Sequence, residues 1–232
     1  NTKRFGMSIA TVILAAGKGT RMNSDIPKVL HPIAGAPMLV HALQAARSQE
    51  PDRMVVVAGH GAEAVSHAVH GYDEDVRVVV QEEQLGTGHA VQQARAALDG
   101  FDGTVIVLYG DTPFVRPETL EAMVAARATQ DVVVLGFEAA DPGRYGRLKM
   151  NGETLDAIVE FKDATEAERA ISLCNSGVVA CDAATLFSLL DDVTDNNAAG
   201  EFYLTDIIGL ARARGLSAGV VTCPEAETLG IN

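Results

Sequence analysis

The chain has 232 residues, of which 47% are hydrophobic, a composition typical of a well-packed globular protein and not of a disordered one. Its length suits one large α/β domain, and it has no apolar run of the ~20 residues that a membrane-spanning helix needs. The net charge of -13 argues against a nucleic-acid partner, because such a partner requires a basic surface.

The charges are unevenly distributed along the chain. Residues 1–30 hold five Lys and Arg and one Asp, a balance of +4, so the rest of the chain carries -17. A basic patch beside a glycine turn in an acidic protein predicts local binding of a small anion. The basic residues 1–7 are followed by only a short apolar run, which argues against a signal peptide and favours a cytoplasmic protein.

Strands and helices are expected to alternate over the first part of the chain. The β-branched apolar run that begins at Thr11 predicts a buried strand that ends in a glycine turn. Helices are then expected at 38–47, 62–69, 89–98 and 117–128, and strands at 53–59, 76–81, 104–109 and 131–137. This alternation is typical of a mostly parallel sheet with helices on both faces.

The pattern changes after residue 137. Segments 147–150 and 154–160 flank Asn151-Gly152, which predicts a small antiparallel hairpin with a two-residue turn. The remaining expected elements are strands at 173–180 and 216–223 and helices at 166–171, 182–190 and 203–214, with Asp182 as the cap of the second helix. No linker or repeat is visible, so we expect one domain over residues 1–232.

Glycine-bearing turns follow three of the expected strands, at residues 15–21, 81–87 and 109–111. Because ligands of such sheets bind beyond the carboxyl ends of the strands, these turns are expected to meet at one rim. In the first turn, small residues let the backbone approach phosphate oxygens, and Lys18, Arg21 and Lys28 can neutralise a phosphate. The spacing matches neither the dinucleotide fingerprint nor the P-loop, since Met22 stands where a third glycine would be needed.

Two further turns carry groups suited to a nucleotide and a metal. Asp111, in Tyr109-Gly110-Asp111, places a carboxylate at the end of a buried strand, where it can hold a hard divalent cation or cap the next loop. Gln81 carries an amide that donates and accepts hydrogen bonds at once, which matches uracil but also other imides. Gly146, Glu160 and Asn175 are candidates for binding sugar hydroxyls or an acetamido group.

Five motifs together resemble the uridylyltransferase domain of the bacterial N-acetylglucosamine-1-phosphate uridyltransferases, a family of bifunctional enzymes among the sugar-nucleotide transferases. They are Leu14-Ala15-Ala16-Gly17-Lys18-Gly19-Thr20-Arg21-Met22, Pro27-Lys28-Val29-Leu30-His31, Gln84-Leu85-Gly86-Thr87-Gly88-His89-Ala90, Tyr109-Gly110-Asp111 and Glu201-Phe202-Tyr203-Leu204-Thr205-Asp206. The resemblance covers residues 8–232 and implies a Rossmann-like, glycosyltransferase A-like nucleotidyltransferase fold. It also implies transfer of UMP from UTP to N-acetylglucosamine 1-phosphate for cell-wall precursor synthesis.

The resemblance assigns expected roles to residues of this chain. Arg21 and Lys28 would meet the triphosphate, and Asp111 and Asn232 would coordinate Mg²⁺. The uridine would be held by Leu14, Ala15, Ala16, Gly17, Gln81, Gly86 and Thr87, and the sugar by Gly146, Glu160 and Asn175, with Tyr109, Gly110 and Asp111 lining the site.

The resemblance also sets expectations about partners, and it leaves alternatives open. The family's hexapeptide-repeat acetyltransferase domain, which carries the trimer contacts, is absent from these residues. We therefore expect no acetyl transfer by this chain, and we expect it to be a monomer. One alternative is another sugar-1-phosphate nucleotidyltransferase, of the UDP-glucose or dTDP-glucose type. The other is a nucleotide-sugar-binding regulator without turnover.

Overall fold

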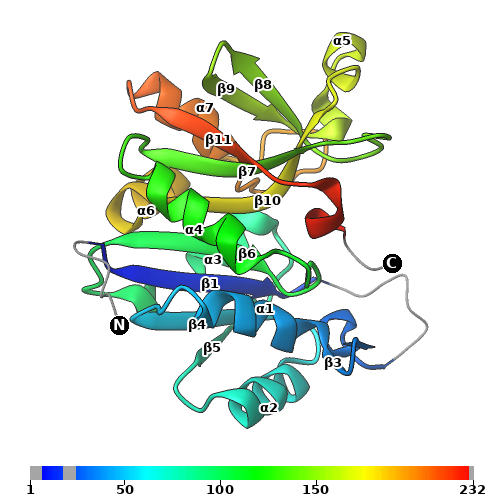
Figure 1. The fold of residues 1–232 in the computed structure, drawn as a ribbon, viewed down its shortest axis with the longest axis vertical. Helices are drawn as coiled ribbons and strands as arrows, with labels where there is room; N and C mark the ends of the chain where they lie inside the picture. The colour runs from blue at the N-terminus through cyan, green and yellow to red at the C-terminus, as the bar shows by residue number, and fades with distance from the viewer. Residues whose placement is uncertain (1–6, 18–24, 230–232) are drawn as a thin grey trace.

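A computed structural model of the chain describes residues 7–17 and 25–229 (Figure 1). In these residues nine strands form one mixed sheet whose main path runs β11-β7-β10-β6-β1-β4-β5. The strands are β1 (Ile9–Ala15), β4 (Arg53–Ala58), β5 (Arg77–Val80), β6 (Thr104–Tyr109), β7 (Val132–Glu138), β8 (Arg147–Asn151), β9 (Thr154–Val159), β10 (Leu173–Asp182) and β11 (Ala218–Thr222). A separate two-stranded hairpin pairs β2 (Pro32–Ile33) with β3 (Ala36–Pro37).

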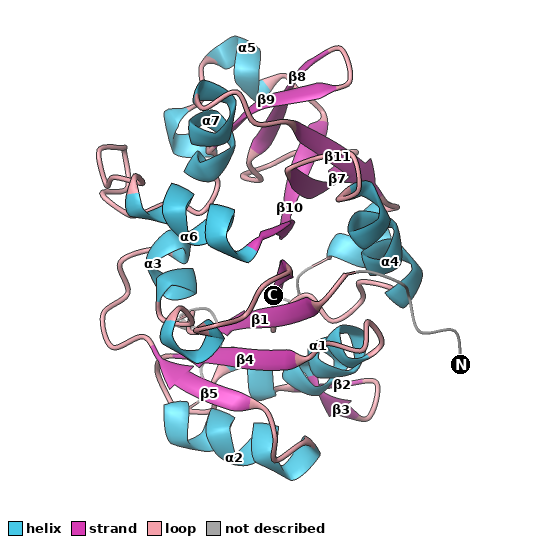
Figure 2. Cartoon of the chain, turned by 90° about the vertical axis from the view of Figure 1, so that its left-hand side faces the viewer, coloured by secondary structure: helices cyan, strands magenta, loops and turns pink. Residues whose placement is uncertain are grey.

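Helices cover both faces of the sheet, as the alternation predicts (Figure 2). Helices α1, α2 and α4 contribute to the apolar core on one face, and α3, α6 and α7 to the core on the other. The helices are α1 (Met38–Arg47), α2 (Ala62–Tyr72), α3 (Thr87–Gln92), α4 (Pro117–Ala126), α5 (Glu166–Arg169), α6 (Ala183–Asp191) and α7 (Asp206–Ala213). Short 3-10 helices are η1 (Lys28–Leu30), η2 (Ala96–Leu98), η3 (Phe161–Asp163) and η4 (Glu225–Thr228).

The central strand β1 is buried on both faces because its side chains alternate between the two cores. Val12 and Leu14 lie in one core, and Ile13 and Ala15 lie in the other. Strand β1 pairs in parallel with β4 on one side and with β6 on the other. The loops after these strands therefore leave the sheet at the same edge, which brings the glycine turns together.

Strand β10 departs from the parallel arrangement. It lies between β6 and β7 and runs antiparallel to both, with a register shift between Asn175 and Val179. At its beginning, Cys174 also pairs with Arg147 of β8, so the β8–β9 hairpin is attached to the main sheet through this one strand. The predicted antiparallel hairpin is confirmed, and β10 extends the antiparallel part of the sheet beyond it.

Two local expectations were wrong in detail. The helix expected at residues 89–98 is divided, because Gln93 and Ala94 donate to carbonyls three residues back and the chain tightens before η2. In the hairpin, Asn151 pairs with Thr154, so the turn residues are 152 and 153 in place of 151 and 152. Gly152 takes a φ of +63°, which glycine adopts without strain.

The expected cap of α6 is present. The Asp182 carboxylate accepts a hydrogen bond from the backbone N–H of Thr185 at 3.0 Å, which satisfies one of the unpaired donors at the start of the helix. None of the helices in the described ranges is long and apolar enough to cross a membrane.

Candidate active site

A cavity of about 310 Å³ opens at the carboxyl ends of β1 and β6. The sequence-predicted residues that line it are Leu14, Ala15, Ala16, Gly17, Lys28, Gln81, Gly86, Thr87, Tyr109 and Asp111. The three predicted turns therefore meet, as the parallel arrangement of their strands requires. Lys18, Arg21 and Asn232 lie outside the described residues.

The wall formed by the end of β1 is built from small residues and backbone. Ala15, Ala16 and Gly17 leave the cavity open close to the main chain, where a planar base or a phosphate can approach. Gly110 lies behind this wall and does not line the cavity. Its N–H donates to the Leu14 carbonyl at 2.9 Å, and a Cβ there would lie only 3.1 Å from Val29 Cγ1.

Gln81 has a defined orientation at the end of the cavity. The side chain is buried, and its Nε2 donates to the Gly86 carbonyl at 3.2 Å and lies 2.9 Å from His89 Nδ1. Since the Gly86 carbonyl can only accept, it fixes the NH₂ group on that side and makes His89 Nδ1 an acceptor. Both amide donors are thus used within the protein, and the Gln81 carbonyl oxygen is left to accept a hydrogen bond from a ligand.

Opposite charges meet at the mouth of the cavity. Lys28 Nζ lies 3.3 Å from Asp111 Oδ2, and both side chains are partly exposed, at 22% and 36%. An ion pair with this exposure contributes little to stability, on the order of 0–1 kcal/mol. Its position beside the small-residue wall suits it to binding a charged ligand instead.

The chemistry of Asp111 fits a hard divalent cation whose other ligands come from elsewhere. In the part of the chain that the structure describes, no group of three or more His, Cys, Asp or Glu residues could hold a metal ion. Mg²⁺ is often bound in this way, through one or two carboxylates, substrate phosphates and water. Asp111 can therefore supply one oxygen ligand to a metal that arrives with a nucleotide.

The three residues predicted for the sugar lie together in a second region. The Asn175 N–H donates to the Gly146 carbonyl at 2.8 Å, and a Cβ on Gly146 would lie 3.7 Å from Glu160 Oε1. Asn175 Oδ1 accepts from the Gly177 N–H at 3.0 Å, which leaves the Asn175 NH₂ group available to a ligand.

Tyr109 joins the two regions. It lines the cavity and also a narrow hollow beside Asn175, and its ring packs against Gly177, where a Cβ would come within 2.6 Å of Cε2. Burial, reinforced by Glu160 and Asp111, raises the pKa of the Tyr109 hydroxyl far above its ordinary value. The hydroxyl therefore stays neutral at physiological pH.

Glu160 is a carboxylate whose negative charge is opposed by its surroundings. Burial raises its pKa, and the negative charges of Asp206, Asp163 and Glu201 raise it further. The Thr205 hydroxyl opposes this by donating to Glu160 Oε1 at 2.9 Å, which stabilises the ionised form. An ionised Glu160 at this position can accept hydrogen bonds from hydroxyl groups of a sugar.

Gln84 and Glu201 also line the cavity but were not predicted as site residues, although both fall in the motifs that carry the family resemblance. Glu201 begins the segment 201–205, which covers the Gly86 turn. The Gly88 N–H donates to the Phe202 carbonyl at 2.8 Å, and the Leu204 N–H donates to Thr87 Oγ1 at 3.0 Å. These contacts join residues more than a hundred positions apart, so local sequence pattern could not reveal them.

Comparison with known proteins agrees with this geometry. Residues 11–187 match the MobA-like NTP transferase domain. The chain is 68% identical over 226 residues to the bifunctional protein GlmU of Roseobacter denitrificans and 66% identical over 226 residues to that of Ruegeria pomeroyi. Each match covers 97% of this chain but 50% of the relative, so the chain spans half the length of these curated relatives.

The fold also has a solved counterpart. The structure of UDP-glucose pyrophosphorylase in complex with UDP-glucose superimposes with a TM-score of 0.74, covering 92% of this chain and 90% of the other. The two sequences are 21% identical, so this likeness concerns the fold. It confirms the nucleotidyltransferase architecture that the sequence motifs predict.

Proposed function

The chain belongs to the MobA-like NTP transferase family and is a nucleotidyltransferase, and we propose that it transfers UMP from UTP to N-acetylglucosamine 1-phosphate. The products would be UDP-N-acetylglucosamine, a precursor of the cell wall, and pyrophosphate. The observation that carries the proposal is the adjacency of two differently equipped regions. The cavity with Gln81, Lys28 and Asp111 suits a uridine nucleotide, and the neighbouring Gly146, Glu160 and Asn175 suit an amino sugar.

Base selection follows from the orientation of Gln81. Because its NH₂ group is held by Gly86 and His89, its carbonyl oxygen would accept from the N3–H of a bound uracil. Cytosine carries no hydrogen at N3, so CTP bound in the same pose would turn an N3 lone pair toward the Gln81 carbonyl oxygen and lose this hydrogen bond. Such a mismatch typically costs about 1–3 kcal/mol.

The chemical step requires positioning and charge neutralisation more than proton transfer. A phosphate oxygen of the sugar 1-phosphate attacks the α-phosphorus of UTP in line, the bond to the β-phosphate oxygen breaks, and pyrophosphate leaves with the electron pair. The attacking oxygen is already anionic, so no general base is needed. Lys28 and Arg21 would hold the triphosphate and offset the repulsion between the two anions.

A divalent metal would add to this electrostatic stabilisation, and we propose Mg²⁺. Asp111 would hold it together with Asn232 and the phosphate oxygens of the nucleotide. Before the nucleotide binds, Lys28 neutralises Asp111 at 3.3 Å. If Asp111 held the metal, the Lys28 ammonium would be available to the phosphates.

We further propose that this transferase domain works as a monomer in the cytoplasm.

The test of the proposed reaction is pyrophosphate release by the purified chain with UTP, N-acetylglucosamine 1-phosphate and Mg²⁺. Turnover should be lost in EDTA and restored by Mg²⁺. A matched panel with glucose 1-phosphate, CTP and dTTP separates the alternatives, since higher kcat/KM with another pair would replace the proposed substrates. Binding of UDP-sugar without pyrophosphate release would identify a regulator instead.

A further inference from the structure

Arg147, the first residue of β8, is a buried cation surrounded by backbone carbonyls. Its side chain donates five hydrogen bonds to four carbonyl oxygens, those of Pro142, Gly143, Tyr145 and Arg169. The residue is only 2% exposed, and in the described part of the chain no carboxylate forms an ion pair with it. All five N–H donors of the guanidinium fork are thus directed at main-chain oxygens.

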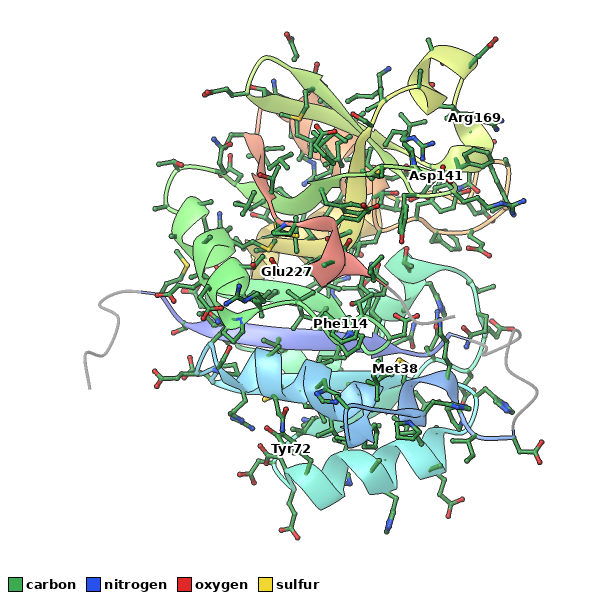
Figure 3. All side chains as sticks on the ribbon, turned by 45° about the vertical axis from the view of Figure 1, so that its right-hand side comes forward. Met38, Tyr72, Phe114, Asp141, Arg169 and Glu227 are labelled. Atoms are coloured by element: carbon green, nitrogen blue, oxygen red, sulfur yellow. The ribbon has the colours of Figure 1, made fainter. Side chains whose placement is uncertain are left out.

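These carbonyls belong to two different segments of the chain. Pro142, Gly143 and Tyr145 lie in the loop that joins β7 to β8, and Arg169 is the last residue of α5. Figure 3 shows Asp141, at the start of this loop, and Arg169 at the same end of the molecule. Nη2 of Arg147 bonds to Gly143 at 3.1 Å and to Arg169 at 3.2 Å, so one group bridges the loop and the helix end.

The loop held by Arg147 leads directly into the sugar region. Gly146 follows Tyr145, its carbonyl accepts from the Asn175 N–H, and its α-carbon faces Glu160. A Cβ at Gly146 would lie 3.3 Å from Ile158 Cγ2, so the backbone here has little spare space. A displacement of the loop would therefore shift Gly146 relative to both Glu160 and Asn175.

We propose that Arg147 is a positioning residue for the acceptor: it fixes the 142–146 backbone so that Gly146, Glu160 and Asn175 form a single binding surface for the sugar 1-phosphate. The inference rests on the proposed function. Lysine cannot replace arginine here, because an ammonium has three donors on a flexible stem and cannot reach four carbonyls at fixed angles. The nucleotide cavity, formed by other loops, does not depend on Arg147.

The test compares Arg147→Lys with Arg127→Lys. Arg127 is a matched control because it also donates to backbone carbonyls, those of Gln130 and Asp131 at 2.7 and 3.0 Å. These contacts lie just before the start of β7, at the end of that strand away from the cavity. R147K should raise the KM for N-acetylglucosamine 1-phosphate about tenfold or more while the KM for UTP changes less than about twofold. R127K should leave both values near those of the wild type.

A second readout follows the loop itself. Arg144 is exposed within it, so trypsin should cut after Arg144 severalfold faster in R147K than in the wild type or R127K, as measured by mass spectrometry.

If R147K does not fold, the wild type provides the test, because UDP-N-acetylglucosamine should slow this cut and UTP alone should not. Equal changes in both KM values, or cutting that neither the variant nor the ligand alters, would overturn the inference. Failure of the wild type to use any sugar phosphate would refute the proposed function, whereas the cutting rates of R147K and R127K would still report on the loop.

Discussion

Lys28 and Asp111, 83 positions apart in the chain, form an ion pair of 3.3 Å at the mouth of the cavity. Each is the charged residue of a different predicted motif, and the motifs also meet where Val29 lies against Gly110. The pair is partly exposed, so its contribution to folding is small. In the proposed reaction, the pair places a cation and an anion where a metal–triphosphate would bind.

We therefore expect Lys28→Ala to affect turnover and not stability. The loss of a cation that offsets charge in phosphoryl transfer should lower kcat about 100-fold, while Tm should change by less than about 2 °C. Arg21→Ala should behave similarly in steady-state pyrophosphate release. Lys3→Ala is the control, since Lys3 lies in the basic start of the chain outside any motif. Equal effects from all three substitutions would refute the assignment of the triphosphate site.

Gln81 should determine the choice of base. Gln81→Leu keeps most of the volume but removes the carbonyl oxygen and both donors to Gly86 and His89. We expect the ratio of kcat/KM for UTP over CTP to fall about 10- to 100-fold, in keeping with loss of one buried hydrogen bond. His89→Gln offers a control for the supporting contact alone and should retain most of the preference. An unchanged ratio in Gln81→Leu would show that the base is read elsewhere.

The contributions of Glu160 and Glu168 to the stability of the native state should change in opposite directions as the pH falls. Burial raises the pKa of Glu160, so its charge destabilises the native state at neutral pH, and this cost disappears as the pH falls through the raised pKa. Glu168, held by Lys149 and the Thr165 backbone, has a pKa lowered to about 2, so its stabilising effect is present at neutral pH and is lost as the pH falls toward that value. Glu160→Gln should thus raise Tm at pH 7, and Glu168→Gln should lower it.

The measurement is thermal unfolding of both variants from pH 7 to pH 3. The gain in Glu160→Gln should be about 2–4 °C, which corresponds to about 1 kcal/mol for a domain of this size, and should vanish in acid. The same variant should bind the sugar phosphate more weakly at pH 7. A Glu160→Gln protein that is less stable at neutral pH would contradict the burial argument.

Glu227 should anchor the end of the described chain to α4. The residue is 7% exposed, and its Oε1 accepts from the Arg116 N–H at 3.0 Å and the Thr119 hydroxyl at 2.6 Å. Glu227→Ala leaves donors at the start of α4 unpaired and should cost about 1–2 kcal/mol in urea unfolding. Glu227→Gln keeps an acceptor oxygen and should lose less than half of that. Identical losses in the two variants would point to packing and not to the cap.

The sequence predicts those features that depend on neighbouring residues. Hydrophobic periodicity indicates the α/β alternation, and Asp182 before an apolar run predicts the cap of α6. The convergence of three glycine turns follows from a general property of parallel sheets. Together with the family resemblance, which names the individual residues, this convergence predicts most of the residues that line the cavity.

Features that depend on distant partners could not be predicted in the same way. The antiparallel placement of β10 between β6 and β7 leaves no local signal, because a buried strand has the same composition in either direction. The orientation of Gln81 depends on His89, and the enclosure of Arg147 depends on Arg169. Each requires side-chain geometry that periodicity and motif spacing do not contain.

Strand β10 has a mechanical consequence for the two substrates. Its later residues, such as Val179, pair with β6, and its first residues pair with β7 and β8, so one continuous strand links the nucleotide region to the sugar region. The β10–β7 ladder is interrupted between Asn175 and Val179, but β7 continues past this point and pairs with both parts of β10, through Gly136 and Val134. We therefore expect the pairing of β7 with β10 to set the spacing of the two proposed substrate regions. Any gating of the proposed reaction should then come from loops and not from closure of two lobes.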